Sequence, residues 1–176
     1  GLGNPGGRYE LTRHNVGFMV VDFLAQKWGI SVKKKKADTL LGTGRIAGAE
    51  VMLAKPQTYM NLSGEPLYPL HVAPEDLIVI HDDMDIPLGR IRVKISGGTG
   101  GHKGLVSMKG ALGTGEFIRV RFGIGRPIDD TDPSDYVLER FAKEDRDTVQ
   151  EQIVNAAAAV ELCLAGEVTK AMNAFN

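Results

Sequence analysis

Polar and ionisable side chains gather in four separated stretches, at places where helices and strands are expected to end. The stretches are Asn4 and Tyr9 with Thr12–Asn15, then Gln57–Asn61, His81–Asp85 and Gly97–Lys103. A neutral histidine can take a proton from water, and its second ring nitrogen needs a carboxylate or carbonyl to fix the tautomer. His14 paired with Asp82 would meet this need, and asparagine amides would orient the water and hold a carbonyl substrate. No serine or cysteine stands out as a nucleophile, so direct attack by water is the predicted chemistry.

The same residues also fit simpler roles. His14 could cap a helix, Asn61 could cap another, and His81 at the end of an apolar strand fits a structural hydrogen-bonding role. Residue chemistry alone therefore leaves the water-activating hypothesis open.

The acidic run after residue 81 allows a second enzyme class. Asp82, Asp83 and Asp85 could form a simple acidic turn, or they could bind Mg²⁺ through oxygen ligands. The second possibility would make the protein a Mg²⁺-dependent phosphohydrolase.

Two glycine-rich segments resemble nucleotide-binding loops but lack the required context. "GLGNPG" at residues 1–6 matches G-x-G-x-x-G, yet several polar residues follow before a helix begins near Asn15, and Pro5 lacks an N–H donor. "GGTGGHKG" at residues 97–104 lacks the Gly-Lys-Ser/Thr of a phosphate-binding loop. The sequence therefore argues against a nucleotide-binding role for either segment.

Composition places the chain among ordinary globular proteins. It has 176 residues, 43% of them hydrophobic, and a net charge of −1, which excludes a strongly basic nucleic-acid binder but not a basic patch. The single cysteine, Cys163, excludes a disulfide framework. No signal peptide or membrane-length apolar run is visible, so we predict a cytoplasmic protein.

Periodicity predicts helices alternating with strands. Residues 16–28 read as a helix capped by Asn15 and ended by Gly29, and residues 40–56 read as two strands around a turn at 47–49. Further strands are expected in 77–83, 90–95 and 117–125, with helices in 102–112 and 143–166. A helix is also expected after Asn61, shortened or kinked by Pro69.

This order indicates an α/β fold in which residues 1–176 form a single domain. We expect a twisted mixed β-sheet with helices on both sides, a three-layer sandwich. Because a glycine loop of this kind usually follows a strand, we also expect a short apolar strand before Gly1.

Taken together, five motifs resemble bacterial-type peptidyl-tRNA hydrolases. They are "GLGNPGGRYELTRHNVGF", "KPQTYMNLSG", "HDDMDIPLGRIRVK", "GGTGGHKGL" and "FIRVRFGIGRP". Their order and spacing agree with that family from Gly1 to about Pro127. The resemblance implies a monomeric α/β enzyme that hydrolyses the ester between a peptide and the 3′-terminal ribose of tRNA, recycling tRNA without a metal or cofactor.

Site residues follow from the resemblance by matching positions. His14 would be the general base, Asp82 would orient and polarise it, and Asn4 would help position it. The positions implied to contact the peptide or the tRNA 3′ end are Tyr9, Met60, Asn61, His102 and Lys103.

Lys103 departs from the family pattern, which usually has asparagine after this histidine. Lysine can donate hydrogen bonds but cannot accept them. We expect Lys103 to contact phosphate or ribose. A non-catalytic RNA-binding homologue, its site altered at Lys103, is a third hypothesis.

A neutral protein that binds tRNA needs a local group of cations. Positions that resemble the family's phosphate-binding residues are Arg92, Lys94, Arg119 and Arg121. Such contacts would read the backbone of the acceptor stem and the CCA end rather than base sequence. A solvated strand face is the alternative explanation of these alternating charges.

Overall fold

The computed structural model describes all of residues 1–176, and its strands form two three-stranded sheets. The first, β1-β2-β3, is antiparallel, with strands Lys34–Lys36, Thr39–Ile46 and Ala49–Pro56. The second has the order β4-β6-β5, with strands Ile78–Asp83, Ile118–Gly123 and Ile91–Lys94. β4 runs parallel to β6, and β5 runs antiparallel to it, so this sheet is mixed as predicted.

The N-terminal segment connects the two sheets. The amino group of Gly1 donates a hydrogen bond of 2.9 Å to the Ala54 carbonyl in β3. The N–H of Leu2 donates one of 2.9 Å to the Ile80 carbonyl in β4. The glycine-rich opening motif thus begins between the sheets and leads Asn4 to the end of β4.

Helices follow the predicted order, with one shortened as expected. They are α1 (Val16–Trp28), α2 (Leu67–Leu70), α3 (Lys103–Leu112), α4 (Pro133–Tyr136), α5 (Arg146–Leu164) and α6 (Val168–Phe175). Single 3-10 turns lie at Arg13–Asn15, Met60–Leu62, Pro74–Asp76 and Lys143–Asp145. α2 has only four residues and ends just after Pro69, which cannot donate a backbone hydrogen bond. None of the helices combines the length and apolar character needed to cross a bilayer.

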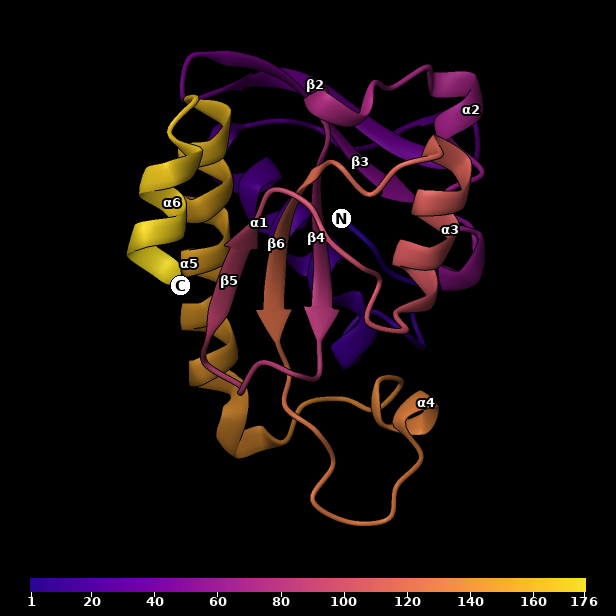
Figure 1. Ribbon diagram of the computed structural model, residues 1–176, viewed down its shortest axis with the longest axis vertical. Coiled ribbons are helices and arrows are strands. Elements are labelled where there is room, and N and C mark those ends of the chain that lie inside the picture. The colour runs from indigo at the N-terminus through magenta and orange to yellow at the C-terminus, as the bar shows by residue number, and fades with distance from the viewer.

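Alternation along β4, β5 and β6 gives the second sheet two different faces. Ile80, Val93 and Val120 point into the larger core, which is shared with α1 and α5. The opposite face has a small apolar cluster that includes Val79 and Leu105 of α3. Helices therefore lie on both sides of the sheet, as predicted (Figure 1). The rest of the second face carries charged side chains of β5 and β6.

Gly17 allows α1 to approach the sheet unusually closely. A Cβ at this position would collide with the Leu2 backbone and with the Ile80 carbonyl oxygen. Because α1 begins directly after the turn that carries His14, this contact sets the distance between His14 and the end of β4.

Gln152 joins α5 to the ends of two strands. This side chain is 1% exposed, and its oxygen accepts a 2.7 Å hydrogen bond from the Gly89 N–H. Its amide nitrogen donates to the carbonyls of Arg90 and Gly123, at 2.8 Å each. The start of β5 and the end of β6 therefore depend on one glutamine.

Gln152→Ala should lower the free energy of unfolding by about 2 kcal/mol, because it removes a buried side chain that binds three backbone groups, among them the buried Gly123 carbonyl. Urea denaturation followed by circular dichroism measures this loss. Gln150→Ala, at an exposed position of the same helix, is the matched control and should change stability by less than about 0.5 kcal/mol. Equal effects of the two substitutions would contradict the role given to Gln152.

Candidate active site

His14 lies on the 3-10 turn Arg13–Asn15, immediately before α1. The N–H of His14 donates to the Val137 carbonyl at 2.8 Å, and the N–H of Arg13 donates to the Glu139 carbonyl at 3.0 Å. The turn is thereby fixed to the segment that follows α4, which lies beyond the ends of β4 and β6 (Figure 1). His14 itself is buried at the base of a cleft.

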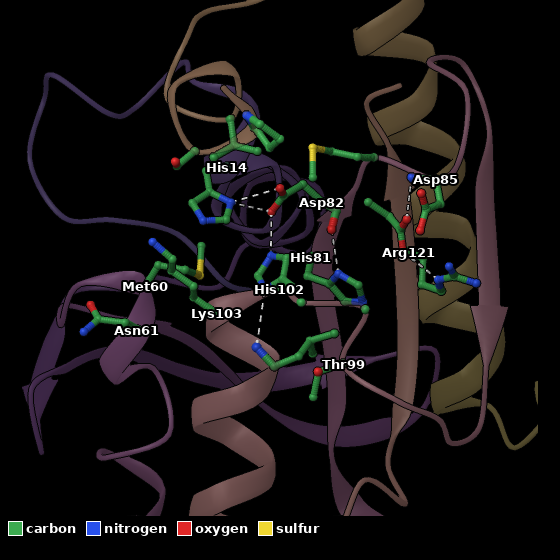
Figure 2. A pocket seen from close by; sticks show the side chains of 18 of the residues that line it. His14, Met60, Asn61, His81, Asp82, Asp85, Thr99, His102, Lys103 and Arg121 are labelled. Carbon is green, nitrogen blue, oxygen red and sulfur yellow. Dashed lines mark hydrogen bonds and ion pairs between the residues drawn. The ribbon is translucent and has the colours of Figure 1, made fainter. Parts of the chain in front are cut away.

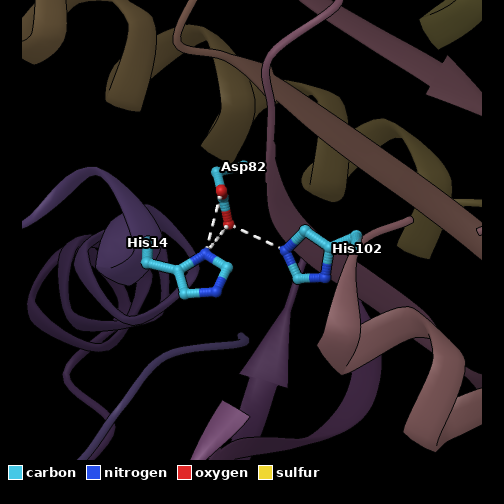
Figure 3. A group of neighbouring side chains, drawn as sticks. All are labelled: His14, Asp82 and His102. Atoms are coloured by element: carbon cyan, nitrogen blue, oxygen red, sulfur yellow. Dashed lines mark hydrogen bonds and ion pairs between the residues drawn. The ribbon is translucent and has the colours of Figure 1, made fainter. Parts of the chain in front are cut away.

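Asp82, the last residue but one of β4, is 2% exposed and contacts two imidazoles. Nδ1 of His14 lies 2.9 Å from both carboxylate oxygens, and Nε2 of His102 lies 2.8 Å from Oδ1 (Figure 3). Burial alone would raise the pKa of Asp82. The charges and hydrogen bonds of His102 and His14 outweigh burial and hold this pKa well below its ordinary value. The carboxylate is therefore ionised and accepts a hydrogen bond from each ring.

These contacts determine the tautomers of both rings. Nδ1 of His102 accepts a hydrogen bond of 3.3 Å from the Leu105 N–H and caps α3, so the proton of a neutral His102 is on Nε2, facing Asp82. Since Asp82 can only accept, Nδ1 of His14 donates to it. Nε2 of a neutral His14 then has a free lone pair on the side of the ring away from Asp82 (Figure 3). Nε2 of His14 can therefore receive a proton and act as a base.

His81 forms the third member of this imidazole group. Its Nδ1 donates to the Asp82 carbonyl at 2.7 Å, while its buried Nε2 has no hydrogen-bond partner. Its ring meets the His102 ring edge-on, with 5.1 Å between centroids. Burial, with the nearby His102 second, lowers the pKa of His81 to about 3, so the ring stays neutral.

Asn4 is held by two separate segments. The Asn15 side chain accepts from the Asn4 N–H and donates to the Asn4 carbonyl, at 2.9 Å each. The Asn4 side-chain oxygen accepts a 2.8 Å bond from the Met60 N–H. Asn15 thus occupies the N-cap position of α1, as predicted, but its side chain makes no capping hydrogen bond because its amide is used in this long-range contact.

A cleft of about 940 Å³ opens above His14 and Asp82. It is lined by Asn4 and by all five residues predicted to contact the peptide or the tRNA 3′ end: Tyr9, Met60, Asn61, His102 and Lys103. Figure 2 shows Asn61, Met60 and Lys103 on one side of the His102 ring and Arg121 with Asp85 on the other. Asn61 is exposed on the turn Met60–Leu62 and caps no helix, so its amide is free for a ligand.

The four predicted phosphate-binding residues differ in their surroundings. Arg92 and Lys94 are exposed on the charged face of the sheet, although Arg92 does not line the cleft. Arg121 lies directly across the ladder from Arg92, and its Nε donates to Asp83 at 2.8 Å. This face therefore presents two exposed cations beside one that is paired with a carboxylate.

Arg119 is buried and already engaged. Its guanidinium donates to the carbonyls of Gly97, Gly98 and Gly115, and it lies over the Phe117 ring. Arg119 thus supports the glycine-rich loop that leads to His102. No local pattern predicts this role, because two of the three carbonyls, those of Gly97 and Gly98, lie more than twenty residues away in sequence.

The remaining carboxylates of the acidic run do not share a ligand set with Asp82. Asp83 accepts from Arg121, and Asp85 accepts from Arg126 Nε at 3.0 Å, so both are paired with arginines. The group whose ligand atoms lie closest is His14, Asp82 and His102, all within 4.8 Å of one another. Its N–O distances of 2.8 and 2.9 Å are those of direct hydrogen bonds. The arrangement therefore fits proton transfer better than Mg²⁺ ligation.

Comparison with known proteins gives one consistent family. A model of the family described as peptidyl-tRNA hydrolase matches residues 1–176. A peptidyl-tRNA hydrolase of Bacillus subtilis (strain 168) is 49% identical over 180 residues, covering 100% of this chain and 96% of the relative. One of Geobacillus thermodenitrificans is 48% identical over 180 residues, covering 100% and 97%. The crystal structure of the Acinetobacter baumannii peptidyl-tRNA hydrolase superposes with a TM-score of 0.92 at 40% identity, covering 98% of this chain and 90% of that one.

As the pH falls, the free energy of unfolding of the wild-type protein should decrease more steeply than that of the His81→Phe variant. The pKa of His81 is about 3 in the folded chain and 6.5 without the fold. Between these values the unfolded chain binds a proton that the folded chain does not, so unfolding is favoured by up to about 1.4 kcal/mol per pH unit as the pH falls.

Urea denaturation at pH 7, 6 and 5 measures both slopes, and the comparison concerns the slope rather than stability at neutral pH. Parallel slopes for the two proteins would contradict a neutral, buried His81.

Proposed function

The chain belongs to the peptidyl-tRNA hydrolase family, and we propose that a water molecule activated by His14 attacks and cleaves the ester between a peptide and the tRNA 3′-ribose. The observation that carries this proposal is the His14–Asp82 pair, with Nδ1 2.9 Å from the carboxylate and Nε2 on the opposite side of the ring. His14 lines the cleft that also contains the asparagines and Lys103.

The proton balance follows from the tautomers. Nε2 of His14 takes a proton from water as its oxygen attacks the ester carbonyl carbon, giving a tetrahedral intermediate. The bond to the ribose 3′-oxygen then breaks, and the proton on His14 is passed to that oxygen. The products are a tRNA with a 3′-hydroxyl and a free peptide carboxylic acid, which releases the remaining proton of the water to solvent and becomes a carboxylate.

Asp82 stabilises the imidazolium that forms during this step. Its carboxylate is ionised because its pKa is held low by both histidines, so it offers a full negative charge to a protonated His14. His102 fixes the carboxylate from the other side, at 2.8 Å. The base therefore keeps one orientation through the proton transfer.

Asn4 and Asn61 supply amides to the substrate. Since Asn4 Oδ1 is engaged with the Met60 N–H, the Asn4 nitrogen is the group left to donate to a substrate oxygen or to water. Asn61 is exposed beside Met60 and is placed to contact the peptide backbone. An N-blocked substrate offers amide groups to such contacts, whereas a free α-ammonium does not accept hydrogen bonds.

The charged face of the sheet and Lys103 would bind the tRNA backbone. Lys94, Arg92 and Arg121 carry the charge on the sheet, and Tyr9 would contact the 3′ end. Lys103, exposed at the start of α3, is placed to meet phosphate or ribose. Such contacts discriminate little between sequences, which suits an enzyme that accepts many tRNAs.

The wider setting is proposed on the same basis. The reaction needs no metal in this scheme, because His14 activates the water. It would recycle tRNA that left the ribosome with its peptide attached, in the cytoplasm, with residues 1–176 acting as one monomeric domain.

His14→Ala should reduce hydrolysis of N-acetyl-aminoacyl-tRNA by about 10²- to 10⁴-fold, the range expected for loss of a general base. Release of the blocked amino acid is measured with and without EDTA, and EDTA should leave the wild-type rate unchanged. Binding of deacylated tRNA should persist in the variant and serves as the folding control. Near-normal turnover by His14→Ala would rule out this mechanism.

An exposed cation and the buried Arg119 can be distinguished by the salt dependence of tRNA binding. Lys94→Met should reduce the dependence of log Kd on log salt by roughly 0.7 to 0.9, the contribution of one phosphate contact. Arg119→Met should lower the free energy of unfolding but leave this slope unchanged, because Arg119 binds loop carbonyls. Filter binding of tRNA from 50 to 300 mM KCl measures both slopes, and a reduced slope for Arg119→Met would restore it as a phosphate ligand.

A further inference from the structure

One buried side chain near the cleft has no role in the scheme above. Asn15 is 1% exposed, and its amide forms a pair of hydrogen bonds with the backbone of Asn4. Both bonds measure 2.9 Å, one to the N–H and one to the carbonyl. Paired on both sides of its Cα, Asn4 cannot shift along the chain or rotate without breaking a buried hydrogen bond.

Asn15 is also the residue next to His14. Both lie on the 3-10 turn Arg13–Asn15, which is fixed by the bonds of Arg13 and His14 to the segment after α4. One rigid turn therefore holds the base directly and Asn4 through the Asn15 side chain. Any movement of the turn would carry the base and the Asn4 amide together.

The other end of this connection fixes the direction of the Asn4 amide. Its oxygen accepts from the Met60 N–H at 2.8 Å, and a flipped amide would face that N–H with another donor. The nitrogen consequently lies at the cleft with no protein acceptor. Asn15 therefore fixes the position of the Asn4 backbone, and Met60 fixes the orientation of the Asn4 side-chain amide.

We infer that Asn15 is a positioning residue that sets the distance between the Asn4 amide and His14, and thereby the preference for N-blocked over unblocked substrate. The inference rests on the proposed function, in which substrate amide groups meet Asn4 and water is activated at His14. Asn15 contacts neither the substrate nor the water. Its effect passes entirely through Asn4.

The test is a double-mutant cycle of Asn15→Ala and Asn4→Ala. In the wild-type background, Asn15→Ala should lower kcat for N-acetyl-aminoacyl-tRNA by about 10-fold or more, with KM changed by less than about threefold. The ratio of kcat/KM between blocked and unblocked substrates should fall by about 10-fold. In the Asn4→Ala background the same substitution should change that ratio by less than about twofold, because its target is gone.

Loss of stability is controlled separately. Val160→Ala truncates a core residue of α5. It is adjacent to Glu161, which binds Trp28 at the end of α1 away from His14. This variant should be destabilised but keep the wild-type substrate ratio. Asn15→Ser, whose shorter side chain keeps a polar group at this site but does not reach Asn4, should also lower the ratio and replaces Asn15→Ala if that variant fails to fold.

The outcomes separate this inference from the proposed function. If the wild-type protein hydrolyses neither substrate, the proposed function fails and the inference fails with it. If the wild-type protein prefers the blocked substrate while Asn15→Ala and Asn15→Ser keep the same ratio, the inference alone is overturned. Multiplicative effects of Asn15→Ala and Asn4→Ala overturn it as well.

Discussion

The buried carboxylate of Asp82 is the constraint on which the site depends. An ionised carboxylate with 2% of its residue exposed is tolerable only if donors surround it, and here they come from His14 before α1 and from His102 before α3. One electrostatic requirement therefore brings three segments together: the turn of His14, the end of β4 and the cap of α3. The same requirement assigns the tautomers. The hydrogen bond by which His14 stabilises the Asp82 carboxylate also leaves Nε2 of His14 free to act as a base.

The sheet separates apolar packing from charge by strand alternation. Val93 and Val120 face the larger core, whereas Arg92 and Arg121 on the same strands face outward. A chain of net charge −1 can thus present cations on one surface, because the balancing carboxylates lie elsewhere or, as at Asp83, within the ion pairs themselves. Affinity for a polyanion is then a property of one face rather than of overall composition.

Local signals in the sequence were sufficient for the elements and for the central pair. Gly29 ends α1 in the left-handed conformation, as expected of glycine after a helix, and Pro69 limits α2. His14 and Asp82 could be paired because a catalytic imidazole needs a carboxylate. The role of Asn15 was missed because its amide can cap a helix locally or bind the backbone of a loop residue eleven positions away. Only the tertiary fold decides between such options, and the same holds for the carbonyls that Arg119 binds.

The adjacency of His14 and Asn15 limits how the length of this chain can vary. In a 3-10 turn each residue turns the side-chain direction by about 120°, so one residue inserted between the two would turn either the imidazole away from the cleft or the Asn15 amide away from Asn4. The exposed loop of residues 6 to 8 has no such restriction, because none of its side chains lines the cleft. Insertions and deletions are therefore tolerable in that loop, whereas the histidine–asparagine dipeptide must stay contiguous.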